Sequence, residues 1–143
     1  MEFGATHAVA SSQQAAALLT ELTWGRMAQV CVNTMGVGDG DQIGASLALV
    51  GKRGRVVVTN LHPAAETQVT MSALDLTTFE KQVRGSLFGS SNPRADIPRM
   101  LELHRSGKLK LAELRTRTYR LDQINAGFDD MRKGRNLRGV ITF

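Results

Sequence analysis

Three glycines at alternate positions are the first candidate for chemistry in this sequence. Gly36, Gly38 and Gly40 follow an apolar, valine-rich run and precede a stretch with helical periodicity. Such a turn can approach a pyrophosphate closely, because glycine has no side chain. The dinucleotide pattern G-x-G-x-x-G, however, needs a glycine where this chain has Asp41, and no carboxylate ends a strand about twenty residues later. We therefore interpret the glycines as a flexible turn between a strand and a helix.

Histidine and cysteine are too few and too scattered to predict a metal site. The histidines are His7, His62 and His104, and the one cysteine is Cys31. None of them has a paired spacing such as C-x-x-C or H-x-x-x-H, which would place two ligands on the same side of an ion. We expect no metal ligand in this chain, and we expect Cys31 to be a core residue of a strand.

The sequence also offers no candidate catalytic residue. It contains neither a G-x-S-x-G elbow nor an activated cysteine. Two adjacent carboxylates, Asp129 and Asp130, are of the residue type that performs acid–base catalysis. They lie close to Arg132 and Lys133 in a polar helical stretch, so we expect them to be part of a solvated surface.

Composition and charge indicate a soluble domain whose positive charge is concentrated in its second part. The chain has 143 residues, of which 42% are hydrophobic, and a net charge of +5. No apolar run approaches the roughly 20 residues that cross a bilayer, and the start lacks the features of a signal peptide. The basic residues of the second part alternate with apolar ones and have few aromatics among them, which argues against a nucleic-acid partner. We expect a cytoplasmic protein with no membrane partner.

Strands and helices alternate in the first part of the chain. The expected elements are a short strand at 7–10, a helix between Ser11 and Gly25, a strand within 27–35, a helix around 43–50 that the segment 51–54 ends, and a strand at 55–61. A further amphipathic stretch at 72–80 leads into a last strand at 81–88. This order predicts an α/β fold with parallel strands joined by right-handed crossovers.

The pattern changes beyond residue 89, where we place a domain boundary. The expected elements there are a helix at 97–104, a strand at 115–119, a helix at 122–132 and a terminal strand. The sequence therefore predicts two parts, 1–89 and 90–143.

Several motifs along the chain are those of one enzyme family. They read Phe3-Gly-Ala-Thr-His7, Ser72-Ala-Leu-Asp-Leu, Gly85-Ser-Leu-Phe-Gly89, Asn92-Pro-Arg, Tyr119-Arg-Leu-Asp-Gln-Ile-Asn-Ala-Gly-Phe128 and Asn136-Leu-Arg-Gly-Val-Ile-Thr-Phe143. Together they resemble the C-terminal portion of zinc-dependent medium-chain alcohol dehydrogenases. The likeness is greatest to the nitroso-dimethylaniline-dependent branch of actinobacteria.

The resemblance implies a fold and an activity for the parent enzyme. Residues 1–89 would be the second half of a Rossmann-type, NAD-binding parallel sheet, and residues 90–143 a small α+β C-terminal segment of the catalytic, GroES-like domain. The parent would transfer hydride between an alcohol and the nicotinamide cofactor. Its zinc ligands and glycine-rich turn would lie upstream of Met1, so we expect this chain alone to be inactive.

The resemblance also implies which residues contact the cofactor. They are Thr34, Met35 and Gly36 for the adenosine half, Thr59, Asn60 and Leu61 for the nicotinamide, the backbone of Ser86, Leu87 and Phe88 for the carboxamide, and Arg138 for the phosphates. A homodimer would form through the strand near Val83–Leu87. The alternative hypothesis is an inactive truncated relative that acts as a dimeric interaction module or a weak nucleotide-binding module.

Overall fold

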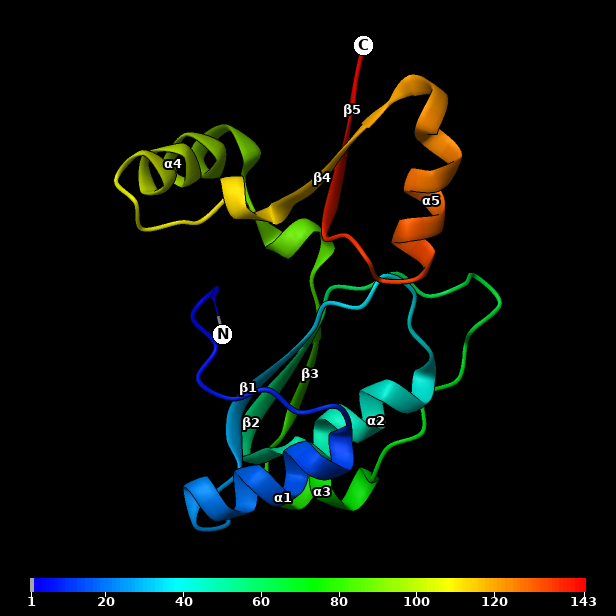
Figure 1. Ribbon diagram of the computed structural model, residues 1–143. Helices are drawn as coiled ribbons and strands as arrows, with labels where there is room; N and C mark the ends of the chain where they lie inside the picture. The colour runs from blue at the N-terminus through cyan, green and yellow to red at the C-terminus, as the bar shows by residue number, and fades with distance from the viewer. Residues whose placement is uncertain (1) are drawn as a thin grey trace. The chain divides into compact units, whose positions relative to one another are not determined.

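Figure 1 shows the protein as a computed structural model that describes residues 2–143. The chain divides into two compact units, and the division falls between Ser91 and Asn92. Among the described residues, no helix has the length and apolar character needed to cross a membrane.

A three-stranded parallel sheet forms the centre of the first unit. Its strands are β1 (Ala28–Asn33), β2 (Val50–Val58) and β3 (Gln82–Gly85), in the order β1-β2-β3. Cys31 of β1 lies opposite Val56 of β2, which in turn lies opposite Val83 of β3. The predicted α/β class with parallel strands is confirmed.

Three helices accompany this sheet, and each begins at a polar side chain that accepts a backbone hydrogen bond. Helix α1 (Ser12–Thr23) is capped by Ser11, α2 (Gly40–Leu49) by Asp39, and α3 (Ala73–Thr78) by Ser72. Such caps bond the amides that the first helical turn leaves unpaired. Helix α2 packs on β1 and β2, and α1 packs on α2.

The core of the first unit is small. Leu47, Val50 and Val56 are its fully buried side chains, and Cys31 packs against them as a partly buried residue. Beside the core, the buried amine of Lys81 donates a 3.0 Å hydrogen bond to the carbonyl oxygen of Leu47. The expected core position of Cys31 is confirmed.

Two predicted elements in the first unit are wrong. Residues 7–10 form no strand. Residues 51–54 do not simply end a helix, because β2 already begins at Val50 and runs through them. There the register against β1 shifts, and Arg53 takes a left-handed φ of 59°. Gly51 lies so close to the carbonyl oxygen of Arg26 that a Cβ atom would collide with it, so this glycine serves close packing.

The second unit combines two helices with a pair of parallel strands. Its elements are α4 (Pro93–Arg105), β4 (Arg115–Arg120), α5 (Ile124–Arg132) and β5 (Arg138–Thr142). Short 3-10 turns lie at Leu87–Ser90 in the first unit and at Ala112–Leu114 and Leu121–Gln123 in the second. Helix α4 starts earlier than predicted, because Asn92 caps it and proline at position 93 suits the first helical turn.

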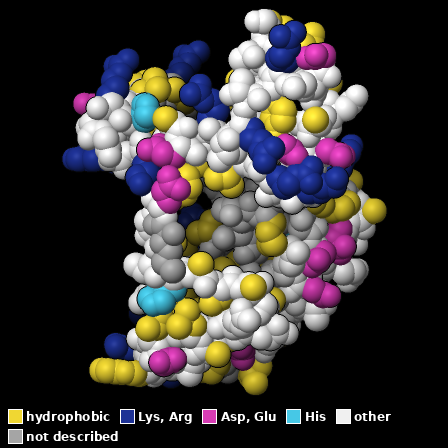
Figure 2. Space-filling view, viewed as in Figure 1, with side chains coloured by type: hydrophobic (Ala, Val, Ile, Leu, Met, Phe, Trp, Pro, Cys, Tyr) yellow, Lys and Arg dark blue, Asp and Glu magenta, His cyan; other side chains and the backbone are white. Residues whose placement is uncertain are grey.

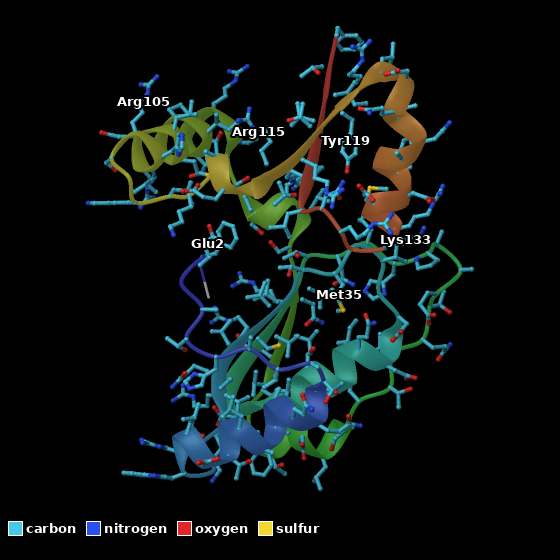
Figure 3. All side chains as sticks on the ribbon, in the orientation of Figure 1. Glu2, Met35, Arg105, Arg115, Tyr119 and Lys133 are labelled. Carbon is cyan, nitrogen blue, oxygen red and sulfur yellow. The ribbon has the colours of Figure 1, made fainter. Side chains whose placement is uncertain are left out.

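A buried carboxylate joins α5 to β4 in the second unit. The side chain of Asp130 accepts hydrogen bonds from Tyr119 Oη at 2.8 Å and Arg117 Nη1 at 3.0 Å, and forms a 2.6 Å ion pair with Arg135. Asn136 in turn donates to Tyr119 Oη at 2.9 Å. Figure 3 shows Tyr119 between the strand and the helix. The prediction of a solvated Asp130 is wrong, because this face of α5 packs on β4.

These donors also determine the charge of Asp130. The hydrogen bonds from Tyr119 and Arg135 hold the pKa of Asp130 below its ordinary value, although burial opposes them. The carboxylate therefore stays ionised and forms ion pairs with two arginines. Its neighbour Asp129 is exposed, as predicted, and pairs with Lys133 at 3.2 Å.

Candidate functional site

Three loops leave the sheet of the first unit at the same edge. Residues 34–36 follow the end of β1, residues 59–61 follow β2, and residues 86–88 follow β3. Because the strands are parallel, their carboxyl ends lie together, and this edge is where α/β folds bind ligands. We call these nine residues the carboxyl edge.

Hydrogen bonds hold the three loops against one another. The amide and the hydroxyl of Thr59 both donate to the carbonyl oxygen of Asn33, at 3.1 and 2.7 Å. The amide of Ser86 donates to the carbonyl oxygen of Val58 at 2.9 Å. The structure thus brings together nine of the ten residues that the sequence singled out.

Large apolar side chains at the carboxyl edge are exposed. Leu61 and Leu87 are each 69% exposed, Phe88 is 84% exposed, and Met35 is 40% exposed. Exposed apolar groups gathered at one place mark binding surfaces more often than single ones do. A Cβ atom added to Gly36 would have no neighbouring atom within 4 Å, so open space lies beside this residue. The edge offers both room and apolar surface to a ligand.

The backbone after β3 turns sharply. Phe88, Gly89 and Ser90 all take left-handed conformations, with φ of 49°, 71° and 55°. Such values are uncommon for phenylalanine and serine, and strained backbone of this kind clusters at ligand sites. A hydrogen bond of 2.9 Å between the hydroxyls of Ser86 and Ser90 closes the turn. The turn leaves Leu87 and Phe88 in solvent.

Polar atoms without partners lie beneath the same edge. Within the described part of the chain, Nδ2 of Asn33 and Oδ1 of Asn60 are buried and make no hydrogen bond. The other amide atom of Asn60 contacts His62 Nε2 at 3.2 Å. Gly38 lies against Asn60 so closely that a Cβ atom would collide with its side chain. Buried unpaired polar atoms are costly, and both of these belong to residues at or next to the carboxyl edge.

One residue of this region was not singled out from the sequence. Val37 pairs with Leu61 through an isolated parallel bridge, and the amide of Gly38 donates to the carbonyl oxygen of Leu61 at 3.2 Å. The bridge extends the pairing of β1 and β2 past their ends. The neighbouring glycines were a signal of close backbone approach, which the structure shows at Gly38.

Arg138 belongs to the second unit and is not part of the carboxyl edge. It is the first residue of β5, it is exposed, and it lies opposite Arg115 of β4. A pocket of about 210 Å³ beside it is lined by Tyr119, Phe128 and Ile141, among others. Within the second unit, Arg138 is therefore an exposed arginine at the start of β5.

A zinc site does not fit the residues present. Nowhere in residues 2–143 do three His, Cys, Asp or Glu side chains gather as they would around a metal ion. Structural and catalytic zinc need three or four such ligands.

Comparison with known proteins gives the family. Residues 1–106 match the family described as zinc-binding dehydrogenase. The chain is 45% identical over 141 residues to the NDMA-dependent alcohol dehydrogenase of Amycolatopsis methanolica and 39% identical over 143 residues to alcohol dehydrogenase B of Mycobacterium tuberculosis. These two matches span 99% and 100% of this chain, respectively, but only 38% of the length of each relative.

The solved structures agree. Benzyl alcohol dehydrogenase of Acinetobacter calcoaceticus superposes with a TM-score of 0.85 at 28% identity, over 96% of this chain and 37% of that one. These matches confirm the resemblance to alcohol dehydrogenases that the sequence motifs indicated. The chain therefore belongs to the zinc-binding dehydrogenase family.

Proposed function

We propose that this chain supplies part of the nicotinamide-cofactor site of an NAD-dependent, zinc-containing alcohol dehydrogenase. One observation carries the proposal: three loops with exposed apolar side chains and unpaired polar atoms meet at the carboxyl edge of a parallel sheet. Ligands of open α/β sheets bind outside this edge. The relatives, which the chain matches over 38% of their length, support an alcohol dehydrogenase as the parent. NAD is the cofactor that the resemblance of the sequence motifs implies.

Each loop has its own part in the proposal. Residues 34–36 border the adenosine half of NAD, and residues 59–61 lie against the nicotinamide. The backbone of residues 86–88 binds the carboxamide, next to the left-handed turn at Phe88. Arg138 contacts the phosphates. We assign residues 1–89 to the cofactor domain and 90–143 to the catalytic domain.

The bound nicotinamide would accept or give the hydride, and the chain's own residues would hold it in place. Apolar side chains at the carboxyl edge exclude water from one face of the ring. Because no three potential zinc ligands gather among the described residues, we propose that this chain does not oxidise alcohols by itself. A cytoplasmic location belongs to the same proposal.

A substitution at Gly36 tests the cofactor site. A Cβ atom at this position meets nothing, so Gly36→Leu should fold normally. Its side chain would fill the space that the cofactor needs, and we expect NAD binding to weaken about tenfold or more, which corresponds to at least 1.4 kcal/mol. Isothermal titration calorimetry with NAD measures the affinity. In a separate assay, the wild-type chain supplied with NAD, zinc and alcohols should form no NADH.

The control is Ala45→Leu, because Ala45 is exposed on α2 and adds the same apolar surface elsewhere. Equal NAD affinities for wild type, Gly36→Leu and Ala45→Leu would contradict the site. Zinc-dependent formation of NADH by the wild-type chain would contradict its inactivity.

We also propose that the chain forms a homodimer through β3. This strand lies at the edge of the sheet order, and all four of its residues are exposed. A lysine on an exposed edge strand discourages pairing between copies. Val83→Lys should therefore weaken the dimer about tenfold, as measured by sedimentation equilibrium. Val69→Lys, at a half-exposed position outside the sheet, should leave it unchanged. A monomeric wild type would show that β3 does not pair.

A further inference from the structure

The charges of the second unit are not evenly paired. From Arg115 to Arg138 the sequence contains seven cations and three carboxylates. Figure 2 shows dark blue and magenta side chains beside each other in this part of the molecule. The pairs are Arg117 and Arg135 with Asp130, Arg120 with Asp122, and Arg132 and Lys133 with Asp129. The three carboxylates thus account for five of the seven cations.

The two cations that remain are Arg115 and Arg138. No carboxylate among residues 2–143 lies within ion-pair distance of either side chain. They are also direct partners in the register of β4 and β5. Neighbouring strands lie about 4.8 Å apart, and like charges placed directly opposite destabilise a sheet. The register therefore sets the backbones of these two arginines opposite each other, next to the register shift between Arg115 and Arg117.

Local bonds keep the starts of these strands together despite the repulsion. The amide of Leu137 donates to Thr116 Oγ1 at 2.9 Å, next to both arginines. The loop before β5 is tied down by Arg135, whose amide donates to the carbonyl oxygen of Asp130 at 2.8 Å, and by the bond from Asn136 to Tyr119. An anion bound by both arginines would offset the repulsion between their charges.

We propose that Arg115 and Arg138 together form one binding site for a phosphate or pyrophosphate group. The inference rests on the proposed function for Arg138 and adds Arg115 to it. Two guanidinium groups, each charged at every physiological pH and each able to donate two parallel hydrogen bonds, suit the oxygens of a nucleotide's pyrophosphate. Arg117 and Arg135 are held in ion pairs with Asp130, whereas Arg115 and Arg138 have no such partner among residues 2–143.

The probe is inorganic pyrophosphate. It is titrated into the whole chain at low salt, and calorimetry measures its affinity. The variants are Arg115→Gln, Arg138→Gln and Arg120→Gln. The last is the matched control, because Arg120 lies at the other end of β4, carries the same charge and pairs with Asp122. We expect Arg115→Gln and Arg138→Gln each to weaken binding about threefold to fivefold, and Arg120→Gln to leave it nearly unchanged.

The other outcomes overturn the inference in distinguishable ways. Loss of affinity with Arg138→Gln alone would remove Arg115 from the site and leave the proposed function standing. Equal losses with all three variants would mean that pyrophosphate responds only to net charge. Failure of the wild type to bind pyrophosphate would overturn both the two-arginine site and the phosphate role of Arg138. Equal melting temperatures would establish that all variants are folded.

Discussion

Replacing Leu47 by alanine is expected to destabilise the first unit more than any substitution at its surface. Leu47 is 2% exposed and is one of three fully buried side chains in the core. Removing a buried leucine side chain usually costs about 2–5 kcal/mol, through lost burial and the cavity that remains. Because whole domains are stable by only about 5–15 kcal/mol, Leu47→Ala would leave the first unit close to unfolding.

Urea denaturation with hydrogen exchange of the β2 amides measures this effect. The control is Leu74→Ala, since Leu74 is 69% exposed in α3, and its replacement should change the free energy of unfolding by about 0.5 kcal/mol or less. Amides of β4 in the second unit should keep their protection in both variants. Equal effects of Leu47→Ala and Leu74→Ala would show that the small core does not support the sheet.

The second large effect is expected from Tyr119→Phe. The hydroxyl of Tyr119 donates to Asp130 and accepts from Asn136, and the residue is 8% exposed. Phenylalanine fills the same space but leaves both partners short of a hydrogen bond. Losing a hydrogen bond to a charged group costs about 1.5–3 kcal/mol, so β4, α5 and the loop before β5 should open more readily.

Hydrogen exchange of the β4 and β5 amides is the measurement for Tyr119→Phe. Thr118→Ala provides the control, because Thr118 is an exposed neighbour on the same strand. Protection in the first unit should not change in either variant. If β4 and β5 exchanged equally fast in wild type and Tyr119→Phe, the hydroxyl would contribute nothing to the second unit.

Much of the fold could be predicted from local signals in the sequence. The helix expected after Ser11 and the amphipathic stretch expected at 72–80 correspond to α1 and α3, and the strands expected within 27–35 and at 55–61 correspond to β1 and part of β2. The order of strands and helices then implied parallel pairing, since parallel strands need crossovers. That pairing is why the residues after β1, β2 and β3 lie at one edge.

The remaining features depend on contacts between distant residues, which no local pattern records. Gly51 looked like the end of a helix, but it lies within β2, close to the carbonyl oxygen of Arg26. Asp130 looked exposed because its neighbours in the sequence are charged, whereas its bonds go to Tyr119 and Arg117 on β4. The opposition of Arg115 and Arg138 likewise follows only from the strand register.

The parallel pairing in both units also affects how the chain folds. In the described residues, β1 pairs with β2, β2 with β3 and β4 with β5, all in parallel, so these ladders contain no hairpin. Before the first hydrogen bond of each strand pair can form, the chain must close a loop that contains a helix. Contacts so far apart in sequence slow the search for the native state. The capped helices can form early on the microsecond scale, and sheet formation should set the folding rate.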